Sequence, residues 1–546
     1  MKSNILLITA DQWRGDCLSA LDHALLATPN LDRLADAGTL FSRHYANAVP
    51  CSPARACLYS GLYQMNNRVC MNGSPLDARH DTLALAFRRL GYDPNLFGYT
   101  DQSEDPRKLN ANDPRLRSYE GLLPGFTWRV CMSDDQRSWL SWLQAQGYEH
   151  ALQSDPVAFH IPEQGVDDPP SAGVPVYRAE HTETAYLVGE FSRWLAEECS
   201  PARMQSRTTG WFAHLSFLRP HPPFVVPAPY DKQYSAADVP DFCGSGDWQR
   251  ESKLHPLIDF LQNTVTKDHF IPGTSGHVRD WSEKDLKQIA ATYYGMCAEV
   301  DAQVGRLLDL LTEAGERENT SVVFTSDHGE QLGDHHLLGK YGFFEQSFHV
   351  PLIISDPTRS ATHGQQIDAF TEAVDVMPTL LAAVDAEIPA QLDGCSLLPF
   401  LDHAEPGEDA LKGRSTAGQG KADWRKAVHW EYDFRDVVGR KAEEYFGLPS
   451  QACNLSVMRG ERYKYVHFAA LPPLLFDLLE DPHETRNLAE EPDYQSTVRA
   501  CAEDLLSWRA QHLDQSLALS RITSTGWVDT KREPDVTFTA GGFDEQ

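Results

Sequence analysis

Asn4-Ile5-Leu6-Leu7-Ile8-Thr9-Ala10-Asp11-Gln12 is the stretch from which the architecture of this chain can be worked out. Its apolar run is too short for a secretion signal, has no small-residue cleavage site and ends in a carboxylate, so we interpret it as a buried strand. Apolar runs at residues 211–217 and 321–326 predict two more strands of this kind. Continuous apolar strands are typical of a sheet that helices cover on both faces.

Helical patterns alternate with these strands. One starts at Pro29 behind a capping Thr28, one spans residues 81–90 before Gly91, and a long one spans residues 281–314. Short strands at residues 426–432, 455–460, 463–467 and 474–478, and a helix at 494–512, predict a small antiparallel sheet. The predicted fold class is α/β, with a large central, mostly parallel β-sheet flanked by helices and a smaller C-terminal antiparallel sheet with a helix.

This pattern divides the chain into three parts. We expect a large α/β domain at residues 1–385, a smaller α+β subdomain at 386–512 and a C-terminal tail at 513–546. The tail has weak periodicity, so it is either disordered or an arm laid on another subunit. The polar, glycine-rich residues 412–424 are expected to form a surface loop.

Composition limits the partners and the compartment. The 546 residues carry 48 Lys and Arg against 78 Asp and Glu, a net charge of −30, which argues against nucleic acid or an anionic membrane as a partner. No stretch approaches the length of a membrane helix. The 11 cysteines are scattered and odd in number, so we expect free thiols in a reducing cytoplasm.

Polar residues follow three of the predicted strands. Because ligands bind beyond the carboxyl ends of the strands in such sheets, the side chains there are candidates for one site. Two carboxylates, an amide oxygen and an imidazole could hold one divalent cation, namely Asp11, Gln12, Asp327 and His328. Oxygen ligands favour Ca, Mg or Mn, and the imidazole favours Mn. Any single pair of these residues could instead be a turn or a cap.

Cys51-Ser52-Pro53-Ala54-Arg55 groups a thiol, a helix-starting proline and an arginine. A helix that starts here would direct N–H groups at an anion, with Arg55 as a charged donor. Thiolate chemistry needs a histidine base, and none is close in sequence, so these residues alone do not identify the nucleophile. Lys340 is either a surface lysine or a contact for phosphate or sulfate. Of His335 and His336, at most one is expected to face the site, with the other on the solvated surface.

These motifs resemble those of the sulfatases in the alkaline phosphatase superfamily. The resemblance covers most of the chain, and it rests on the Cys51–Arg55 motif together with residues 4–12, 28–34, 326–340, 476–478 and 482–488. The chain looks closest to the cytoplasmic phosphonate monoester hydrolases and related arylsulfatases, on residues 219–224, 463–468 and the long tail.

The resemblance implies a mechanism. A formylglycine-generating enzyme would convert Cys51 to formylglycine, whose hydrated aldehyde attacks sulfur or phosphorus with the help of one divalent ion, Mn or Ca. Arg55 would orient this group, and His221 and Lys340 would touch the transferring oxygens, with His221 as a possible proton donor to the leaving group. Asn72, Tyr99 and Thr100 resemble substrate-binding positions, although Tyr99 and Thr100 could equally be satisfied core groups.

The resemblance leaves the substrate open between two anionic esters. Gln12 and His328 look like the phosphonate-hydrolase branch, whereas Ser52 is common in sulfatases. We expect an arylsulfatase-type hydrolase of sulfate monoesters that also accepts phosphonate monoesters and phosphodiesters. The alternative is a phosphonate monoester hydrolase or phosphodiesterase as the main activity. A phosphoglycerate mutase relative and a binding protein without activity are weaker alternatives. We also expect a cytoplasmic homodimer or homotetramer.

Overall fold

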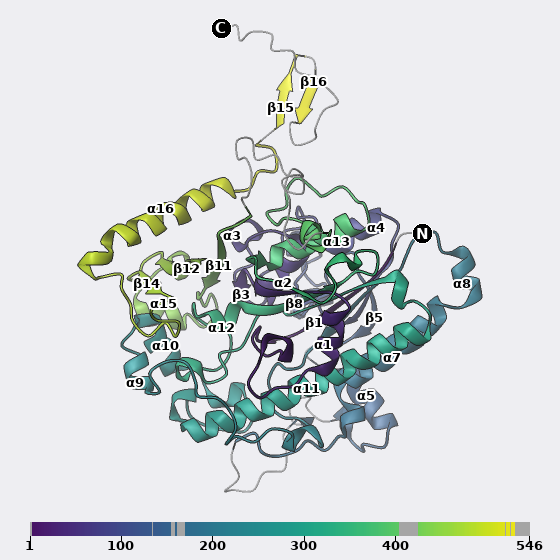
Figure 1. The fold of residues 1–546 in the computed structure, drawn as a ribbon, viewed down its shortest axis with the longest axis horizontal. Helices are drawn as coiled ribbons and strands as arrows, with labels where there is room; N and C mark the ends of the chain where they lie inside the picture. The colour runs from purple at the N-terminus through teal and green to yellow at the C-terminus, as the bar shows by residue number, and fades with distance from the viewer. Residues whose placement is uncertain are drawn as a thin grey trace.

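A computed structural model describes residues 3–118, 120–133, 135–153, 159–160, 170–402, 424–518, 520–524 and 526–529 (Figure 1). A nine-stranded sheet forms its centre, in the order β10-β2-β8-β7-β1-β6-β4-β5, with β9 paired to β2. The bounds are β1 (Asn4–Ala10), β2 (Thr39–Tyr45), β4 (Pro94–Gly98), β5 (Thr127–Cys131), β6 (Phe212–Phe217), β7 (Thr320–Thr325), β8 (His349–Ser355), β9 (Gln365–Ile367) and β10 (Thr371–Glu372). Only β8 among these described strands runs antiparallel to its neighbours.

Strand β1 lies inside the sheet between β6 and β7, and all seven of its residues are buried. Leu6 and Ile8 belong to the hydrophobic core on one face, and Ile5 and Leu7 belong to the core on the other. This alternation follows from the two-residue period of a strand. It explains why the apolar run is continuous, because neither face of β1 meets water.

Helices cover both faces of the sheet. One core includes side chains of α1 (Pro29–Asp36), α7 (Glu183–Glu198) and α11 (Glu283–Glu313), and the other includes side chains of α2 (Cys51–Ser60), α4 (Leu83–Arg89) and α13 (Val376–Ala383). Helix α11 is the long helix predicted from the sequence, and Ser282 caps its start with Asp285. The mostly parallel, helix-covered sheet predicted from the sequence is therefore confirmed.

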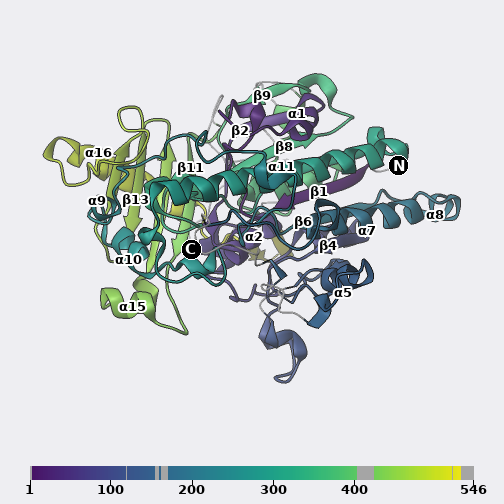
Figure 2. The same cartoon turned by 90° about the horizontal axis from the view of Figure 1, so that it is seen from below.

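A smaller five-stranded sheet lies at one end of the molecule, beside α16 (Figure 2). Its order is β14-β13-β12-β11-β3, with β3 (Ala48–Val49), β11 (Ala427–Asp433), β12 (Asn454–Gly460), β13 (Tyr463–Phe468), β14 (Leu474–Asp477) and the helix α16 (Gln495–Gln511). Four of these strands are antiparallel as predicted, but β3 pairs in parallel with β11. The parts expected at 1–385 and 386–512 thus share one sheet. The loop expected at residues 412–424 lies outside the described residues except for Trp424.

The other α-helices of the described chain surround these two sheets. They are α3 (Gln64–Asn67), α5 (Arg137–Ala145), α8 (Pro201–Ser206), α9 (Trp248–Glu251), α10 (Pro256–Thr264), α12 (Glu345–Phe348), α14 (Leu398–Asp402) and α15 (Lys441–Phe446). No helix among the described residues has the length and apolar character needed to cross a membrane.

The C-terminal tail contains a hairpin that stands away from the body of the molecule (Figure 1). It consists of β15 (Ser520–Thr523) and β16 (Gly526–Asp529), paired antiparallel. Ile522 and Trp527 on this hairpin are 79% and 57% exposed. Large apolar side chains held this far from a core are typical of a surface that another chain covers.

Candidate active site

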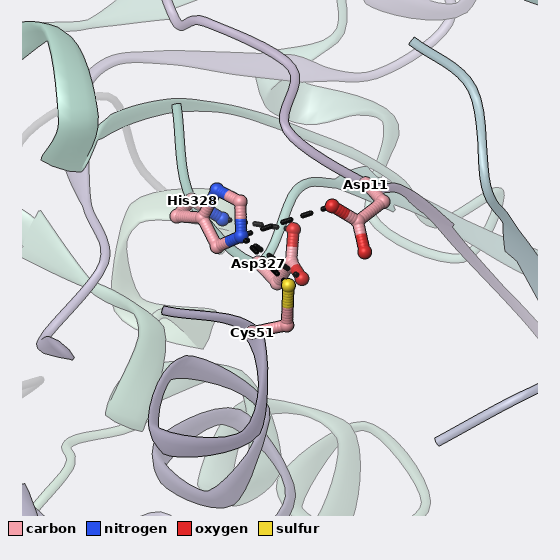
Figure 3. A group of neighbouring side chains, drawn as sticks. All are labelled: Asp11, Cys51, Asp327 and His328. Atoms are coloured by element: carbon pink, nitrogen blue, oxygen red, sulfur yellow. Dashed lines mark hydrogen bonds and ion pairs between the residues drawn. The ribbon is translucent and has the colours of Figure 1, made fainter. Parts of the chain in front are cut away.

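The carboxyl ends of β1 and β7 bring together four groups that can ligate a metal. Asp11 follows β1, Asp327 and His328 follow β7, and the two strands are parallel neighbours. Cys51, the first residue of α2, joins them, and the ligand atoms of all four residues lie within 4.8 Å of one another (Figure 3). Their side chains point toward a common centre, as ligands do at this edge of an α/β sheet.

Arg55 holds the two carboxylates in place from the second turn of α2. Its Nε donates to Asp327 Oδ2 at 2.9 Å, and its Nη2 donates to Asp11 Oδ2 at 3.0 Å. The remaining donors reach Ser216 Oγ at 2.8 Å and Tyr99 Oη at 3.1 Å. Arg55 is completely buried. The sequence suggested a donor to an anion, but these contacts direct the guanidinium to the protein's own carboxylates.

The pKa values of Asp11 and Asp327 are shifted in opposite directions. Burial would raise the pKa of Asp11, but His221, Lys340 and Arg55 lower it below its usual range. Burial and the nearby Asp11 charge raise the pKa of Asp327. A cation between the two carboxylates would relieve this repulsion. Asp11 Oδ1 is buried and has no hydrogen-bond partner among the described residues, as expected of an oxygen that a metal would occupy.

His328 has the form of a metal ligand. Its Nδ1 lies 3.0 Å from the Gly329 carbonyl, so this nitrogen carries the proton and donates. The unprotonated Nε2 faces the group, 3.6 Å from Asp327 Oδ2 and 3.7 Å from Asp11 Oδ1. Burial and Lys340 lower the pKa of His328 to about 3, so the imidazole is neutral. Two carboxylates and a neutral imidazole, with the Gln12 amide oxygen beside them, fit one divalent cation such as Mn or Ca.

Lys340 connects the predicted nucleophile position with Gln12. Its Nζ donates to Cys51 Sγ at 3.1 Å and to Gln12 Oε1 at 2.8 Å. The side chain is buried, so it is not a surface lysine. Burial alone would lower the pKa of Lys340, but Cys51, Asp11 and Asp327 raise it above its usual value. Lys340 is therefore a fixed ammonium beside residue 51.

A histidine lies close to Cys51 in space, although none lies close to it in the sequence. His328 Nε2 lies 3.3 Å from the Cys51 sulfur. Even so, burial and then Asp11 raise the pKa of the Cys51 thiol well above its usual value, against the opposing effect of Lys340. The protein groups around Cys51 thus do not make it a thiolate, the form in which a cysteine attacks.

The start of α2 differs from the expected anion-binding helix end. The Ser52 N–H donates to Asn72 Oδ1 at 3.0 Å, and the Ala54 N–H donates to the Pro50 carbonyl at 3.0 Å. Pro53 has no N–H to offer. Asn72 therefore occupies the N–H of the second helical residue, and the Lys340 ammonium is the charged donor beside residue 51.

The other candidate residues differ in their surroundings. His221 is half-buried, and its Nδ1 lies 2.7 Å from the Pro222 carbonyl, which leaves Nε2 for a substrate. Burial and Lys340 lower the pKa of His221 to about 3. Tyr99 donates its hydroxyl to Asp11 Oδ2 at 2.5 Å. The Thr100 hydroxyl donates to the Gly121 carbonyl and accepts from the Leu123 N–H, so its contacts are those of a satisfied core group.

The histidine pair beyond the Asp327-His328 turn does not join the site. His335 is buried, stacked on Phe344 and 3.0 Å from Glu251, and His336 is half-buried against the Arg279 carbonyl. The expectation that one of the two lies on the solvated surface is wrong for both. One ring nitrogen of each histidine, Nδ1 of His335 and Nε2 of His336, is held by these partners.

Asp101 and Glu330 are two carboxylates that the sequence interpretation missed. Asp101 follows β4, is buried with a φ of 55°, and its Oδ1 has no partner among the described residues. Burial raises the pKa of Asp101 to about 7. The neighbouring Gln102 donates to the Ser52 carbonyl at 2.7 Å, which ties this segment to α2. Asp101 follows a parallel strand, and this position could have marked it as a candidate. Glu330 had no comparable sequence signal beyond its place in the 326–340 motif.

Comparison with known proteins places the chain in a family. Residues 3–386 match the sulfatase family, and residues 333–511 match the C-terminal region of N-sulphoglucosamine sulphohydrolase. The chain therefore belongs to the sulfatase family, within the alkaline phosphatase superfamily, and it is a hydrolase. Members of this family generally use a metal ion and a formylglycine.

Its relatives include both phosphonate and sulfate ester hydrolases. The chain is 50% identical to the phosphonate monoester hydrolase of Agrobacterium radiobacter, with a TM-score of 0.89, over 98% of this chain and 100% of that one. It is 39% identical over 536 residues to the multifunctional alkaline phosphatase superfamily protein PehA of Trinickia caryophylli, 96% of this chain and 98% of the relative. An arylsulfatase of Clostridium perfringens is 27% identical, over 91% of this chain and 92% of the relative.

Proposed function

We propose that this protein hydrolyses phosphonate monoesters and phosphodiesters, and that the same centre also cleaves sulfate monoesters. Cys51 would be converted to formylglycine, and one divalent ion, Mn or Ca, would be held by Asp11, Gln12, Asp327 and His328. The observation that carries this proposal is the position of Cys51. Its sulfur is in contact with the Lys340 ammonium and the His328 imidazole at the edge of the ligand group.

The order of the two substrates reverses the one expected from the sequence. The relatives at 50% and 39% identity are a phosphonate monoester hydrolase and a multifunctional superfamily member, whereas the arylsulfatase is at 27%. Gln12 and His328 in the ligand set support the same choice. Sulfate esters remain the second candidate substrate, because Ser52 is common in sulfatases and one relative is an arylsulfatase. Both classes present a tetrahedral anionic centre to the same groups.

The cofactors would supply a hydrated aldehyde as the attacking hydroxyl and a Lewis acid to polarise it. Around them, Lys340 is placed to offset negative charge on the transferring oxygens, because its ammonium is 3.1 Å from the atom at position 51. His221 has its Nδ1 held by a backbone carbonyl and is neutral, so its Nε2 would face the substrate and would have to take up a proton before passing one to the leaving group. Arg55 would act by holding Asp11 and Asp327.

The local charge fits an anionic substrate in spite of the net charge of −30. Lys340 is a cation in direct contact with residue 51, and Arg55 compensates the two carboxylates behind it. Among the described residues, one group of three or more His, Cys, Asp or Glu ligands comes together. This supports a one-metal hydrolase over a phosphoglycerate mutase relative, which needs a second metal set.

A substrate panel tests the proposal. Enzyme loaded with Mn²⁺, with formylglycine at position 51 verified by peptide mass, would be assayed with an aryl phosphonate monoester, an aryl phosphodiester and an aryl sulfate. We expect measurable kcat/KM on all three, with the phosphonate or the diester highest. A highest value for the aryl sulfate would reassign the main activity, and no hydrolysis of any ester by the verified enzyme would overturn the proposal.

A further inference from the structure

Glu330 is a completely buried carboxylate two residues beyond His328. Its Oε1 accepts hydrogen bonds from the backbone N–H groups of Leu332, at 2.9 Å, and Gly339, at 2.6 Å. Its Oε2 accepts a hydrogen bond from Gln12 Nε2. Each of these three partners of Glu330 is thus an N–H donor, as an ionised carboxylate requires.

Gln12 presents the opposite end of its amide to the active site. Its Oε1 accepts from Lys340 Nζ at 2.8 Å, and the same Nζ contacts Cys51. The backbone of Gln12 is fixed independently. Its N–H donates to Asp327 Oδ1 at 3.1 Å, and its carbonyl accepts from Tyr293 Oη at 2.8 Å. With the backbone fixed, the Gln12 side chain can still turn its amide so that either the oxygen or the NH₂ group faces the cation ligands.

A glutamine amide at position 12 can bind a cation in only one of its two orientations. A carboxylate at position 12 would present an oxygen whichever way it turned, but a glutamine can present either an oxygen or an NH₂ group. A divalent cation binds the oxygen and not the NH₂ group. Because Glu330 accepts only, it can face only the NH₂ end of Gln12.

We propose that Glu330 is a positioning residue that fixes the amide of Gln12 with its oxygen toward the divalent cation. The inference rests on the proposed function in one respect, the presence of a cation at Asp11, Gln12, Asp327 and His328. Residues behind a metal ligand commonly orient it in this way, and their loss costs about 10- to 100-fold in metal affinity. Lys340 supports the same orientation from the other end of the amide.

Exchanging donors and acceptors tests this role without changing the size of the side chains. In Glu330→Gln, the backbone N–H groups of Leu332 and Gly339 hold the new Oε1. The new NH₂ group then meets the Gln12 NH₂ group, and Gln12 turns its oxygen away from the cation. In the double variant Gln12→Glu/Glu330→Gln, the new amide donates to the new carboxylate, and an oxygen faces the cation again.

The measurement is the affinity for Mn²⁺ alone, by isothermal titration calorimetry of chelator-stripped protein. We expect Glu330→Gln to weaken Mn²⁺ binding by at least about 10-fold and the double variant to recover to within a few-fold of the wild type. Gln331→Met is the matched control, because Gln331 is buried in the same loop but bonds to Ser347 rather than to Gln12. It should bind Mn²⁺ as the wild type does.

The outcomes separate this inference from the proposed function. Wild-type affinity in Glu330→Gln, or a double variant no better than the single one, overturns the positioning role. If Glu330→Gln does not fold, the double variant decides alone, since weak Mn²⁺ binding by it contradicts the inference. Absence of Mn²⁺ binding by the wild type overturns it as well. A protein that shows the expected affinities but hydrolyses none of the panel esters retains the inference and loses the proposed function.

Discussion

Lys340 Nζ lies 3.1 Å from the Cys51 sulfur, although 289 residues separate the two in the chain. The contact joins the start of α2 to the loop that follows β7, so the predicted nucleophile and the group that would balance the substrate's charge come from different parts of the fold. The same ammonium reaches Gln12. One lysine therefore touches both the proposed reacting position and a predicted cation ligand.

Replacing Cys51 tests whether this position carries the reaction. We expect Cys51→Ala to lower kcat by at least ~10³-fold on every ester, because the variant cannot form the hydrated aldehyde that we propose as the nucleophile. The thermal midpoint should remain near that of the wild type. Cys57→Ala is the matched control, since Cys57 is a buried thiol on the same helix that bonds Asn67 instead. Comparable rates in Cys51→Ala and Cys57→Ala would contradict the assignment.

Replacing Lys340 by methionine keeps most of the side-chain volume and removes the charge. We expect Lys340→Met to lower kcat/KM by ~10²- to 10³-fold, the usual effect of removing one group that stabilises developing charge. Steady-state assays on the phosphonate ester measure this. Lys287→Met, at a lysine that pairs with exposed Asp241, should leave the rate unchanged. A loss confined to protein yield, with normal kcat/KM, would exclude a role in the reaction.

Arg55→Lys tests the hold on the two carboxylates. A lysine has one nitrogen and cannot reach both Asp11 and Asp327 in the forked geometry of a guanidinium. Breaking such a buried pair costs about 3–5 kcal/mol, so the thermal midpoint should fall. A divalent cation neutralises the same carboxylates, so Mn²⁺ should raise the midpoint of the variant more than that of the wild type. Equal shifts in differential scanning fluorimetry would contradict this account.

Much of the central fold was predictable because its signals are local. The long helix α11 and the buried strands β1, β6 and β7 lie within two residues of their expected bounds. Strand β8 and the pairing of β3 with β11 were not predicted, because they depend on partners about 30 to 380 residues away, whose register no local pattern records.

The site was predictable to the extent that strand ends and family motifs mark it. Asp11, Asp327 and His328 come together as expected, whereas the partners of Arg55 could not be read from a five-residue motif. Nothing in the sequence singled out Glu330, since its burial is possible only because two backbone N–H groups and Gln12 satisfy it.

Glu299 on α11 gives a prediction for stability against pH. Burial raises the pKa of Glu299 from 4.5 to about 7, with Thr182 donating to it at 2.7 Å and Glu183 and Arg219 nearby. Between these two values the folded state keeps a proton that the unfolded state has lost, so stability falls as pH rises through this range. Glu299→Gln should remove this loss and, at pH ~8, be more stable than the wild type by on the order of 1–3 kcal/mol.

Thermal midpoints of the wild type and Glu299→Gln at several pH values measure this effect. The difference between the two proteins should be smallest at low pH and grow toward neutral pH. Midpoints that stay parallel across the range would show that Glu299 ionises in the folded protein as it does in the unfolded chain.

The C-terminal hairpin predicts assembly. We expect a homodimer or homotetramer in which the hairpin lies on a neighbouring subunit, because Ile522 and Trp527 are exposed apolar side chains on a projecting element. Ile522→Glu/Trp527→Glu, or truncation after His512, should shift the mass in sizing with light scattering toward the monomer. Val438→Glu, at another exposed apolar residue on the body, is the control. Unchanged assembly after truncation would contradict an arm that binds a neighbour.

The short strand β3 also bears on when the proposed conversion of Cys51 could take place. Cys51 follows β3 by two residues and is 5% exposed in the finished fold, and β3 pairs with β11, which the ribosome makes about 380 residues later. An enzyme that carried out the proposed conversion would have to bind the chain around Cys51, which the finished fold buries. We therefore expect the proposed conversion to fall in the interval in which residue 51 has been made but β3 has not yet paired with β11. Under this proposal, the folding of the C-terminal sheet would compete with the maturation of Cys51.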